Sequence, residues 1–443
     1  MSWTPPPRAP WADKLAAAGR ALGDDGRSIV SLDADDLLTA SSVGTGLDDF
    51  GDDWFRAPLE RLTTSMDDEA HLHLAGRIRA RAELQTILRN RLALIDLWKR
   101  EPSVLDLEVA PPIVVTGLGR SGTTLLHELL ACDPANRPPL LWELEYTVPP
   151  PTRPSDADDE RARWADDLIT LMDEIVPSFT AMHESRGHWP TECIFAFMHQ
   201  FSSDQFVGLY DIPGYTVWRH GLDQQPIYDW HRKMLQTLQS KAPTERWLLK
   251  APSHLTSLAF VFATYPDARV VVTHRDPLRV VGSLADTMAT LRWMHSDHVD
   301  HASLVEFLCM GLEMQMDVVS AQRDAGDLPN DRIADVRYTD LVADPIGCVA
   351  GLYEQWGIEL TGAVRAHLEA YVAARHTGRA SAHDYRFEDT GLDLAEHRPL
   401  VQPYRTASAW SRRSRSRSGS GSGSPSTPEL VTSHNLTRWN AST

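Results

Sequence analysis

The feature that most restricts the fold of this chain is a short apolar run that ends in a glycine-rich turn. Residues 113–116 (Ile-Val-Val-Thr) predict a strand buried in a parallel sheet. The turn over 117–124 reads Gly-Leu-Gly-Arg-Ser-Gly-Thr-Thr, and leucines at helical spacing predict a helix directly after it. A turn of this kind directs backbone N–H groups and the start of a helix toward one point. The segment therefore predicts a binding site for an anion.

Three further strands are predicted at 246–250, 269–273 and 332–336. Helices are expected to follow the first two, from near Ser253 and near Pro277. Strands that alternate with helices indicate an α/β fold, here a P-loop-like parallel sheet flanked by helices. The aromatic-rich segment at about 160–245 is expected to form a largely helical insertion in it.

The chain divides into three regions by composition. Residues 1–104 predict a mostly helical region, in which 67–100 forms one long helix that Asp67 or Asp68 caps. Four arginines of that helix are expected on a solvated face: Arg77, Arg79, Arg81 and Arg89. Residues 105–405 form the α/β domain. Residues 406–443 begin with Ser-Arg and Gly-Ser repeats and are expected to be a disordered tail.

Charge and cysteine usage exclude several classes of partner. The net charge is −18, so nucleic acid and anionic membranes are not expected to bind the chain as bulk partners. Four widely separated cysteines suit a reducing compartment, and no apolar run is long enough to span a membrane. We expect a cytoplasmic protein without integral membrane association. Assembly into a homo-oligomer stays open.

The glycine-rich turn differs from that of a nucleotide hydrolase. Gly117 and Gly122 have the spacing of the P-loop signature, but Thr123 occupies the position of its lysine. In a hydrolase that lysine contacts the β- and γ-phosphates of the nucleotide. Here the cationic residue is Arg120, inside the turn. A kinase or ATPase is therefore the alternative reading of this motif.

Arg120-Ser121-Gly122-Thr123-Thr124 resembles the loop that binds the 5′-phosphosulfate in sulfotransferases dependent on 3′-phosphoadenosine 5′-phosphosulfate (PAPS). Cytosolic members of this superfamily carry lysine at the position of Arg120, whereas tyrosylprotein sulfotransferases carry arginine. The resemblance implies that the turn binds the donor through Gly117, Gly119, Arg120, Ser121, Gly122, Thr123 and Thr124.

Two later segments extend the resemblance over about residues 105–405, best with the bacterial branch. His274-Arg275-Asp276-Pro277, with Ser283 eight positions after Arg275, is similar to the superfamily's 3′-phosphate site. A guanidinium at a strand end can grip a phosphate with two hydrogen bonds. Tyr338, in Tyr-Thr-Asp-Leu, is similar to the tyrosine that contacts the nucleoside. A late basic segment that closes the site has no clear copy, and His383, Tyr385 and Arg386 are candidates to replace it.

The resemblance implies transfer of a sulfuryl group from PAPS to a hydroxyl or amine of a small, partly apolar acceptor, with release of 3′,5′-adenosine bisphosphate (PAP). Arg120 and Lys250 are the expected cations at the transferred group, and no metal ion is required. A non-catalytic PAP-binding protein is a second alternative.

Three residues compete for the general base. Glu143 is favoured because its placement resembles that of the catalytic glutamate in the branch with an arginine-type loop. His254 resembles the histidine of the cytosolic members, and Glu128 the glutamate of heparan sulfotransferases.

Overall fold

The computed structural model describes residues 3–153, 159–179, 185–378, 390, 393, 395–399 and 401. Five strands form one parallel sheet: β1 (Ile113–Gly117), β2 (Asn136–Arg137), β3 (Arg246–Lys250), β4 (Arg269–His274) and β5 (Ile333–Arg337). Their order in the sheet is β2-β3-β1-β4-β5. The predicted parallel α/β fold is confirmed, with β2 as a strand that the sequence did not reveal.

Strand β1 lies at the centre of the sheet, between β3 and β4. Because the chain leaves β1 toward one side of the sheet and later returns to the other, β1 and its two neighbours meet at a topological switch point. Ligands of open α/β sheets bind at such a place. The register sets Gly117 beside Thr273 and Val115 beside Lys250, so the glycine-rich turn, β3 and β4 all end at one edge.

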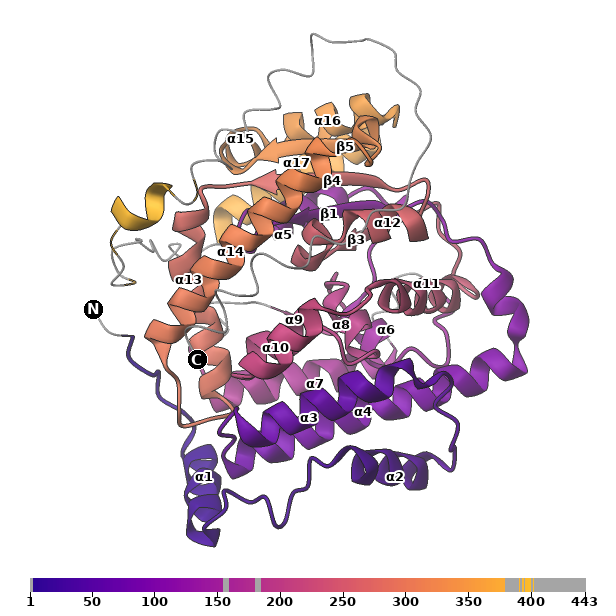
Figure 1. The fold of residues 1–443 in the computed structure, drawn as a ribbon. Helices are drawn as coiled ribbons and strands as arrows, with labels where there is room; N and C mark the ends of the chain where they lie inside the picture. Colours follow the sequence, from indigo (N-terminus) through magenta and orange to yellow (C-terminus); the bar gives the residue numbers. More distant parts are fainter. Residues whose placement is uncertain are drawn as a thin grey trace.

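Alternate residues of the strands face two different cores. Ile113 and Val115 pack with α5 (Thr123–Leu130), α16 (Pro345–Trp356) and α17 (Gly362–Gly378). Val114 of the same strand joins a larger core on the opposite face, with helices that include α12 (Leu258–Thr264), α13 (Pro277–Trp293) and α14 (His301–Asp324). Figure 1 shows the sheet with α15–α17 on one side and most other helices on the other. This two-sided burial explains why the strands read as continuous apolar runs.

The remaining helices belong mainly to two stretches. Before β1 the chain forms α1 (Pro10–Leu22), α2 (Ala34–Thr45), α3 (Arg56–Asp68) and α4 (Leu74–Arg100), with 3₁₀ turns η1 (Asp53–Phe55) and η2 (Pro102–Asp106). Between β2 and β3 it forms α6 (Leu141–Glu145), α7 (Glu160–Ile175), α8 (Ile194–Met198), α9 (Asp204–Leu209), α10 (Pro213–His220) and α11 (Gln225–Gln239). The other elements are η4 (Pro252–Thr256), η5 (Asn330–Arg332) and α15 (Tyr338–Ala343).

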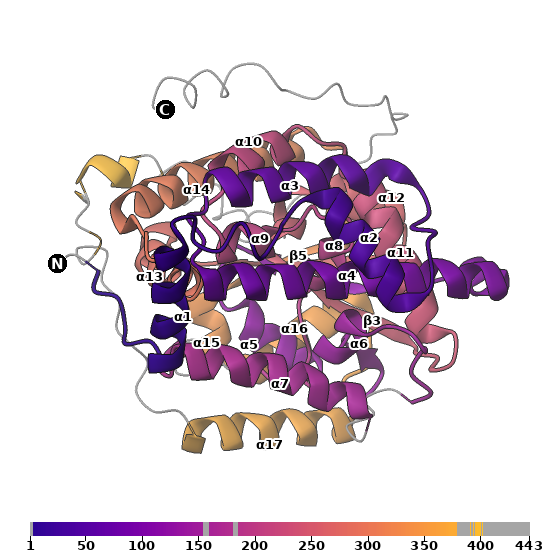
Figure 2. The same cartoon turned by 90° about the horizontal axis from the view of Figure 1, so that it is seen from below.

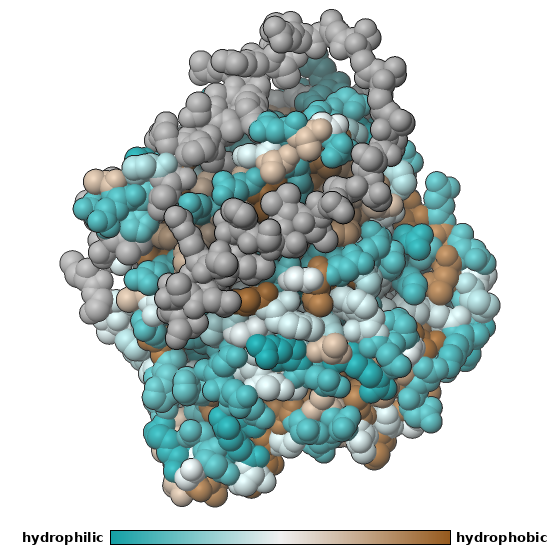
Figure 3. Space-filling model, viewed as in Figure 1, coloured by the Kyte–Doolittle hydropathy of each residue, from teal (hydrophilic) through white to brown (hydrophobic). Residues whose placement is uncertain are grey.

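Helices α3, α4 and α7 lie across the face of the molecule away from the sheet (Figure 2). On the face of the molecule that Figure 1 shows, the surface is largely hydrophilic with scattered apolar side chains (Figure 3).

The predicted long helix at 67–100 was wrong at its start. Helix α3 ends at Asp68, and α4 begins at Leu74. The cap is His73, whose Nδ1 accepts a hydrogen bond from the N–H of Gly76 at 2.9 Å. The expectation of a solvated arginine face was also wrong for Arg77, which is 2% exposed and donates to Asp67 at 2.6 Å. Asp67 thus pairs with an arginine of α4 rather than capping it.

Candidate active site

The glycine-rich turn is held in place by contacts that leave no room for side chains at two of its glycines. Gly117 has φ +151°, and a Cβ there would lie 2.4 Å from Oγ1 of Thr273. Gly122 has φ +97°, and its Cβ would lie 2.9 Å from the ring of Tyr338. Only glycine combines these backbone angles with such close neighbours. The turn therefore packs directly against the ends of β4 and β5.

The hydroxyl of Ser121 is used inside the protein. It donates to the carbonyl of Leu118 at 2.5 Å and lies 2.6 Å from Oγ1 of Thr273, and the residue is fully buried. Of the two threonines that follow Gly122, Thr123 is 5% exposed and Thr124 is exposed at the start of α5. Ser121 thus shapes the turn, while Thr124 is exposed at the carboxyl edge of the sheet.

The residues predicted to bind the two ends of a nucleotide donor come together. Arg120 is exposed and has φ +61°, a backbone conformation that costs energy for a residue with a Cβ. Its Nε donates to Oγ of Ser283 at 3.1 Å, and its carbonyl accepts from Arg275 at 2.9 Å. The Arg275 guanidinium also lies over the ring of Tyr338, 4.2 Å from the ring centroid. Three segments far apart in the sequence thus meet at one edge of the sheet.

Lys250 approaches the same turn from the end of β3. Its Nζ donates to Oγ1 of Thr124 at 3.2 Å, and the residue is 4% exposed. The same Nζ lies 2.9 Å from Oε1 of Glu192, whose side chain is 22% exposed. Sequence reasoning missed Glu192, because it lies in an irregular segment before α8 and belongs to no recognisable motif.

Glu143 lies in the interior, away from solvent. It is fully buried, and its two oxygens accept from Nη2 of Arg137 at 2.7 Å and from the N–H of Leu140 at 3.0 Å. Burial raises the pKa of Glu143, and Arg137 opposes this effect. A carboxylate enclosed in this way holds the turn between β2 and α6 in shape, and this placement argues against its use as a base.

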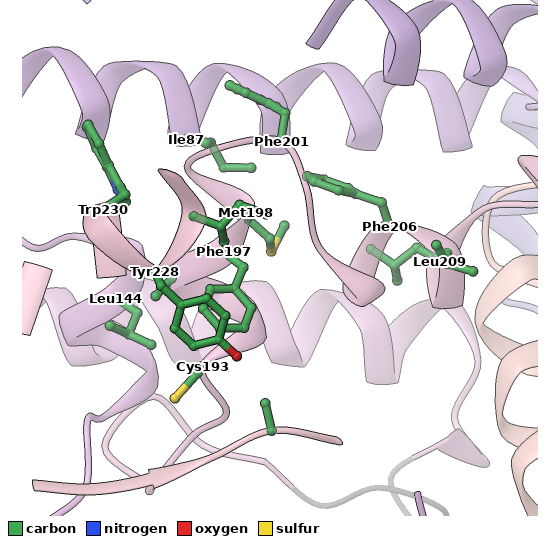
Figure 4. Close-up of a cluster of buried hydrophobic side chains, with 14 of the residues drawn as sticks. Ile87, Leu144, Cys193, Phe197, Met198, Phe201, Phe206, Leu209, Tyr228 and Trp230 are labelled. Carbon is green, nitrogen blue, oxygen red and sulfur yellow. The ribbon is translucent and has the colours of Figure 1, made fainter. Parts of the chain in front are cut away.

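His254 is enclosed as well. It is 1% exposed, its Nδ1 lies 2.8 Å from the Tyr228 hydroxyl, and its Nε2 is buried without a hydrogen-bond partner among the described residues. Burial lowers the pKa of His254 to about 3. Its ring packs edge-on against Phe197, which itself packs against Tyr228 within the apolar cluster drawn in Figure 4. The aromatic residues of this segment that Figure 4 labels thus belong to the core.

Glu128, the third candidate base, binds Tyr371 and Arg375 of α17. These contacts turn its carboxylate toward α17.

A late basic residue lies next to the segment that carries Arg275. Arg398 donates to both carboxylate oxygens of Asp276, the residue that follows Arg275, at 2.8–2.9 Å. The three residues predicted for this role, His383, Tyr385 and Arg386, lie outside the described residues.

The described part of the chain can be searched for membrane-spanning helices and for metal sites. None of its helices is long and apolar enough to cross a membrane. It also contains no cluster of three or more His, Cys, Asp or Glu side chains that could hold a metal ion.

A glycine-rich turn at a topological switch point, bordered by Arg120, Lys250 and Arg275, is an arrangement typical of α/β proteins that bind anionic ligands. The model of the sulfotransferase family matches residues 111–362, more than half of the chain, and the protein belongs to that family of enzymes.

Two solved structures are similar to this chain over most of its length. Sulfotransferase STF1 from Mycobacterium tuberculosis is 30% identical, with a TM-score of 0.72, over 84% of this chain and 98% of the other. Sulfotransferase STF9 from Mycobacterium avium is 25% identical, with a TM-score of 0.76, over 85% and 96%.

An omega-hydroxy-beta-dihydromenaquinone-9 sulfotransferase of Mycobacterium bovis is 22% identical over 347 residues, which are 73% of this chain and 81% of that protein.

Proposed function

We propose that this sulfotransferase moves a sulfuryl group from PAPS to a hydroxyl of a small, largely apolar acceptor and releases PAP. The observation that carries the proposal is the convergence of Arg120, Lys250 and the Arg275–Ser283 pair on one edge of the sheet. PAPS carries anionic groups at its 5′ and 3′ positions, and the site offers a separate cation for each.

The donor would bind along the line from the turn to α13. The turn N–H groups, Arg120, Thr123 and Thr124 would bind the 5′-phosphosulfate, because a helix start and a guanidinium both favour negative charge. Arg275 and Ser283 would bind the 3′-phosphate. Tyr338 would lie beside the nucleoside, with its ring oriented by Arg275.

Sulfuryl transfer resembles phosphoryl transfer in that positioning and electrostatics lower most of the barrier. Arg120 and Lys250 would stabilise the charge that develops on the sulfonate and on the leaving phosphate. The arginine-type loop resembles that of the tyrosylprotein sulfotransferases in this respect. Lys250 is well suited to the task, because its stem is buried and its ammonium is fixed beside Thr124.

The acceptor is proposed from the relative of known activity. Its name describes sulfation of a hydroxylated menaquinone, an apolar body that carries one hydroxyl. We propose an acceptor of the same chemical class here, and an amine acceptor is the second option.

Two binding measurements test the donor. Calorimetry should show that PAP binds tenfold to a hundredfold more tightly than AMP, because charge-assisted bonds to the 3′-phosphate contribute ~1.5–3 kcal/mol each. Equal affinities would refute the assignment of Arg275 and Ser283. Stabilisation by ATP with Mg²⁺ instead of PAP would favour the kinase reading, which Thr123 at the lysine position opposes.

The reaction is tested by a PAPS-consumption screen across hydroxylated isoprenoids, phenols and amines. Formation of PAP that depends on an acceptor is the expected result. Tight binding of PAP with no turnover on any acceptor class would mean that the protein is a non-catalytic PAP-binding member of the family.

A further inference from the structure

We infer that Glu192 is the general base that accepts the acceptor's proton during sulfuryl transfer. The inference rests on the proposed function and assigns a catalytic residue that no motif in the sequence marks. The reaction requires a carboxylate or imidazole beside the transferred group, within reach of a hydroxyl that approaches from solvent. Glu192 meets that requirement better than Glu143 and His254, which are buried, and than Glu128, whose carboxylate binds Arg375 of α17.

The backbone on both sides of Glu192 is fixed. The N–H of Thr191 donates to the carbonyl of Pro139 at 2.9 Å, and the N–H of Cys193 donates to the carbonyl of Lys250 at 2.8 Å. The second of these bonds ties the segment directly to the last residue of β3. Glu192 is thereby held at the carboxyl edge of the sheet, next to the strand that delivers the catalytic lysine.

The side chain makes one strong contact and keeps access to solvent. Its Oε1 lies 2.9 Å from Nζ of Lys250, which in turn lies 3.2 Å from Oγ1 of Thr124 at the start of the loop helix. The Glu192 side chain is 22% exposed, whereas that of Glu143 is fully buried and His254 is 1% exposed. Among these three groups, Glu192 combines contact with the proposed catalytic cation and access for an acceptor.

The proposed step balances as follows. The acceptor oxygen forms a bond to the sulfur of PAPS, and the bond between that sulfur and the bridging phosphate oxygen breaks. The electron pair of the broken bond stays with the phosphate of PAP, and the proton of the acceptor hydroxyl moves to the Glu192 carboxylate. An ammonium has three N–H groups that donate hydrogen bonds. Lys250 can therefore donate to Thr124, to Glu192 and to an oxygen of PAPS at the same time.

One variant distinguishes a general base at position 192 from a purely structural counterion of Lys250. Glu192→Gln keeps an oxygen that can accept from Lys250 but removes the base. For an alcohol acceptor we expect kcat to fall ~10²–10⁴-fold, the usual effect of losing a general base, with PAP affinity unchanged. A nitrophenol, assayed at a pH above its own pKa so that it is ionised, needs no base. The same variant should therefore use it nearly as well as the wild type does.

The matched control is Glu101→Gln, which removes the carboxylate of another lysine–glutamate pair, with Lys241, at the surface. It should retain wild-type kcat with both acceptors.

The outcomes separate the inference from the function on which it rests. If the wild type sulfates the alcohol and Glu192→Gln does so equally well, Glu192 is not the base and the transferase function stands. An equal loss with the alcohol and the nitrophenol makes Glu192 a positioning residue for Lys250 and overturns the inference. If the wild type binds PAP but transfers sulfate to no acceptor, the proposed function itself fails.

Discussion

Two ion pairs beside β3 have the same chemistry and opposite surroundings. Arg137 and Glu143 meet at 2.7 Å with side chains 4% and 0% exposed. Lys250 and Glu192 meet at 2.9 Å with side chains 5% and 22% exposed. The first pair is closed off by the carbonyls of Leu238 and Ala242, which accept from Arg137, and by the ring of Trp247 beneath its guanidinium. The second pair borders the glycine-rich turn through Thr124.

The difference shows what makes a charged pair available for chemistry. A buried pair whose hydrogen bonds all go to protein fixes the chain in one conformation, and neither partner can bind a ligand. A pair with one partly exposed member beside an anion-binding turn can exchange protons and bind charged groups. We call the enclosed residues Arg137, Glu143 and His254 the closed side, and Arg120, Lys250 and Glu192, which lie at or near the glycine-rich turn, the open side. Each prediction below tests this division.

The largest effect is expected on the closed side, in stability. Glu143→Gln leaves Arg137 charged, buried and without its carboxylate. Removal of one partner of a buried pair costs about 3–5 kcal/mol, so the free energy of unfolding should fall by that amount in urea titrations. The surface variant Glu101→Gln should cost less than about 1 kcal/mol. If Glu143→Gln is as stable as the wild type but inactive, the division fails, and Glu143 becomes the base after all.

On the open side, Arg120→Ala should act on turnover and leave the fold intact. The loss of one cation at the developing charge should lower kcat by ~10²–10³-fold, as for removal of one oxyanion donor. The measurement is steady-state release of PAP, with the melting temperature as the control for folding. Turnover within a few-fold of the wild type would assign Arg120 a role in shaping the turn only.

A smaller effect is expected at the far end of the donor site. Arg275→Ala should lower the affinity for PAP by roughly tenfold to a hundredfold and leave the affinity for AMP nearly unchanged, because only PAP carries a 3′-phosphate. Calorimetry with both ligands measures the difference. An equal loss for both ligands would mean that Arg275 acts through Arg120 and Tyr338, which it contacts, rather than on the phosphate.

The smallest effect concerns the pH dependence of stability. Burial lowers the pKa of His254 to about 3, whereas an unfolded histidine has a pKa of about 6.5. Between these values the unfolded chain binds a proton that the folded chain does not, so stability falls as the pH falls. His254→Gln should reduce this loss by ~1 kcal/mol between about pH 6.5 and pH 5.5. The measurement is the free energy of unfolding of both proteins at the two pH values. If the variant and the wild type lose the same amount between them, His254 belongs to the open side.

The sequence indicated the sheet well. Strands buried on both faces are continuous apolar runs, so they can be recognised from consecutive residues alone. The expected strands at 246–250 and 269–273 agree with β3 and β4 to within one residue. Strand β2 has only two residues, too few to form a pattern. The start of α4 was misplaced because the break depends on His71, with φ +47°, and on close packing of Gly76 against the carbonyl of His295.

The candidate donor residues could be proposed from the sequence for a related reason. Arg120, Lys250 and Arg275 each lie at or just past the end of a strand, and parallel strands deliver their ends to one edge of the sheet. Local motifs and topology together were therefore enough to propose that they lie at one edge.

The tertiary structure alone decided which carboxylate faces solvent. Glu143 lies in α6 and Glu192 just before α8, and the exposure of each depends on residues far along the chain. The end of α11 binds the Arg137 that pairs with Glu143, and Lys250 with Thr124 holds Glu192 beside the glycine-rich turn. The sequence by itself determined the fold class and indicated the cations that we propose for the donor site. The base depends on burial, because the charge state and reach of a carboxylate are set by everything that packs around it.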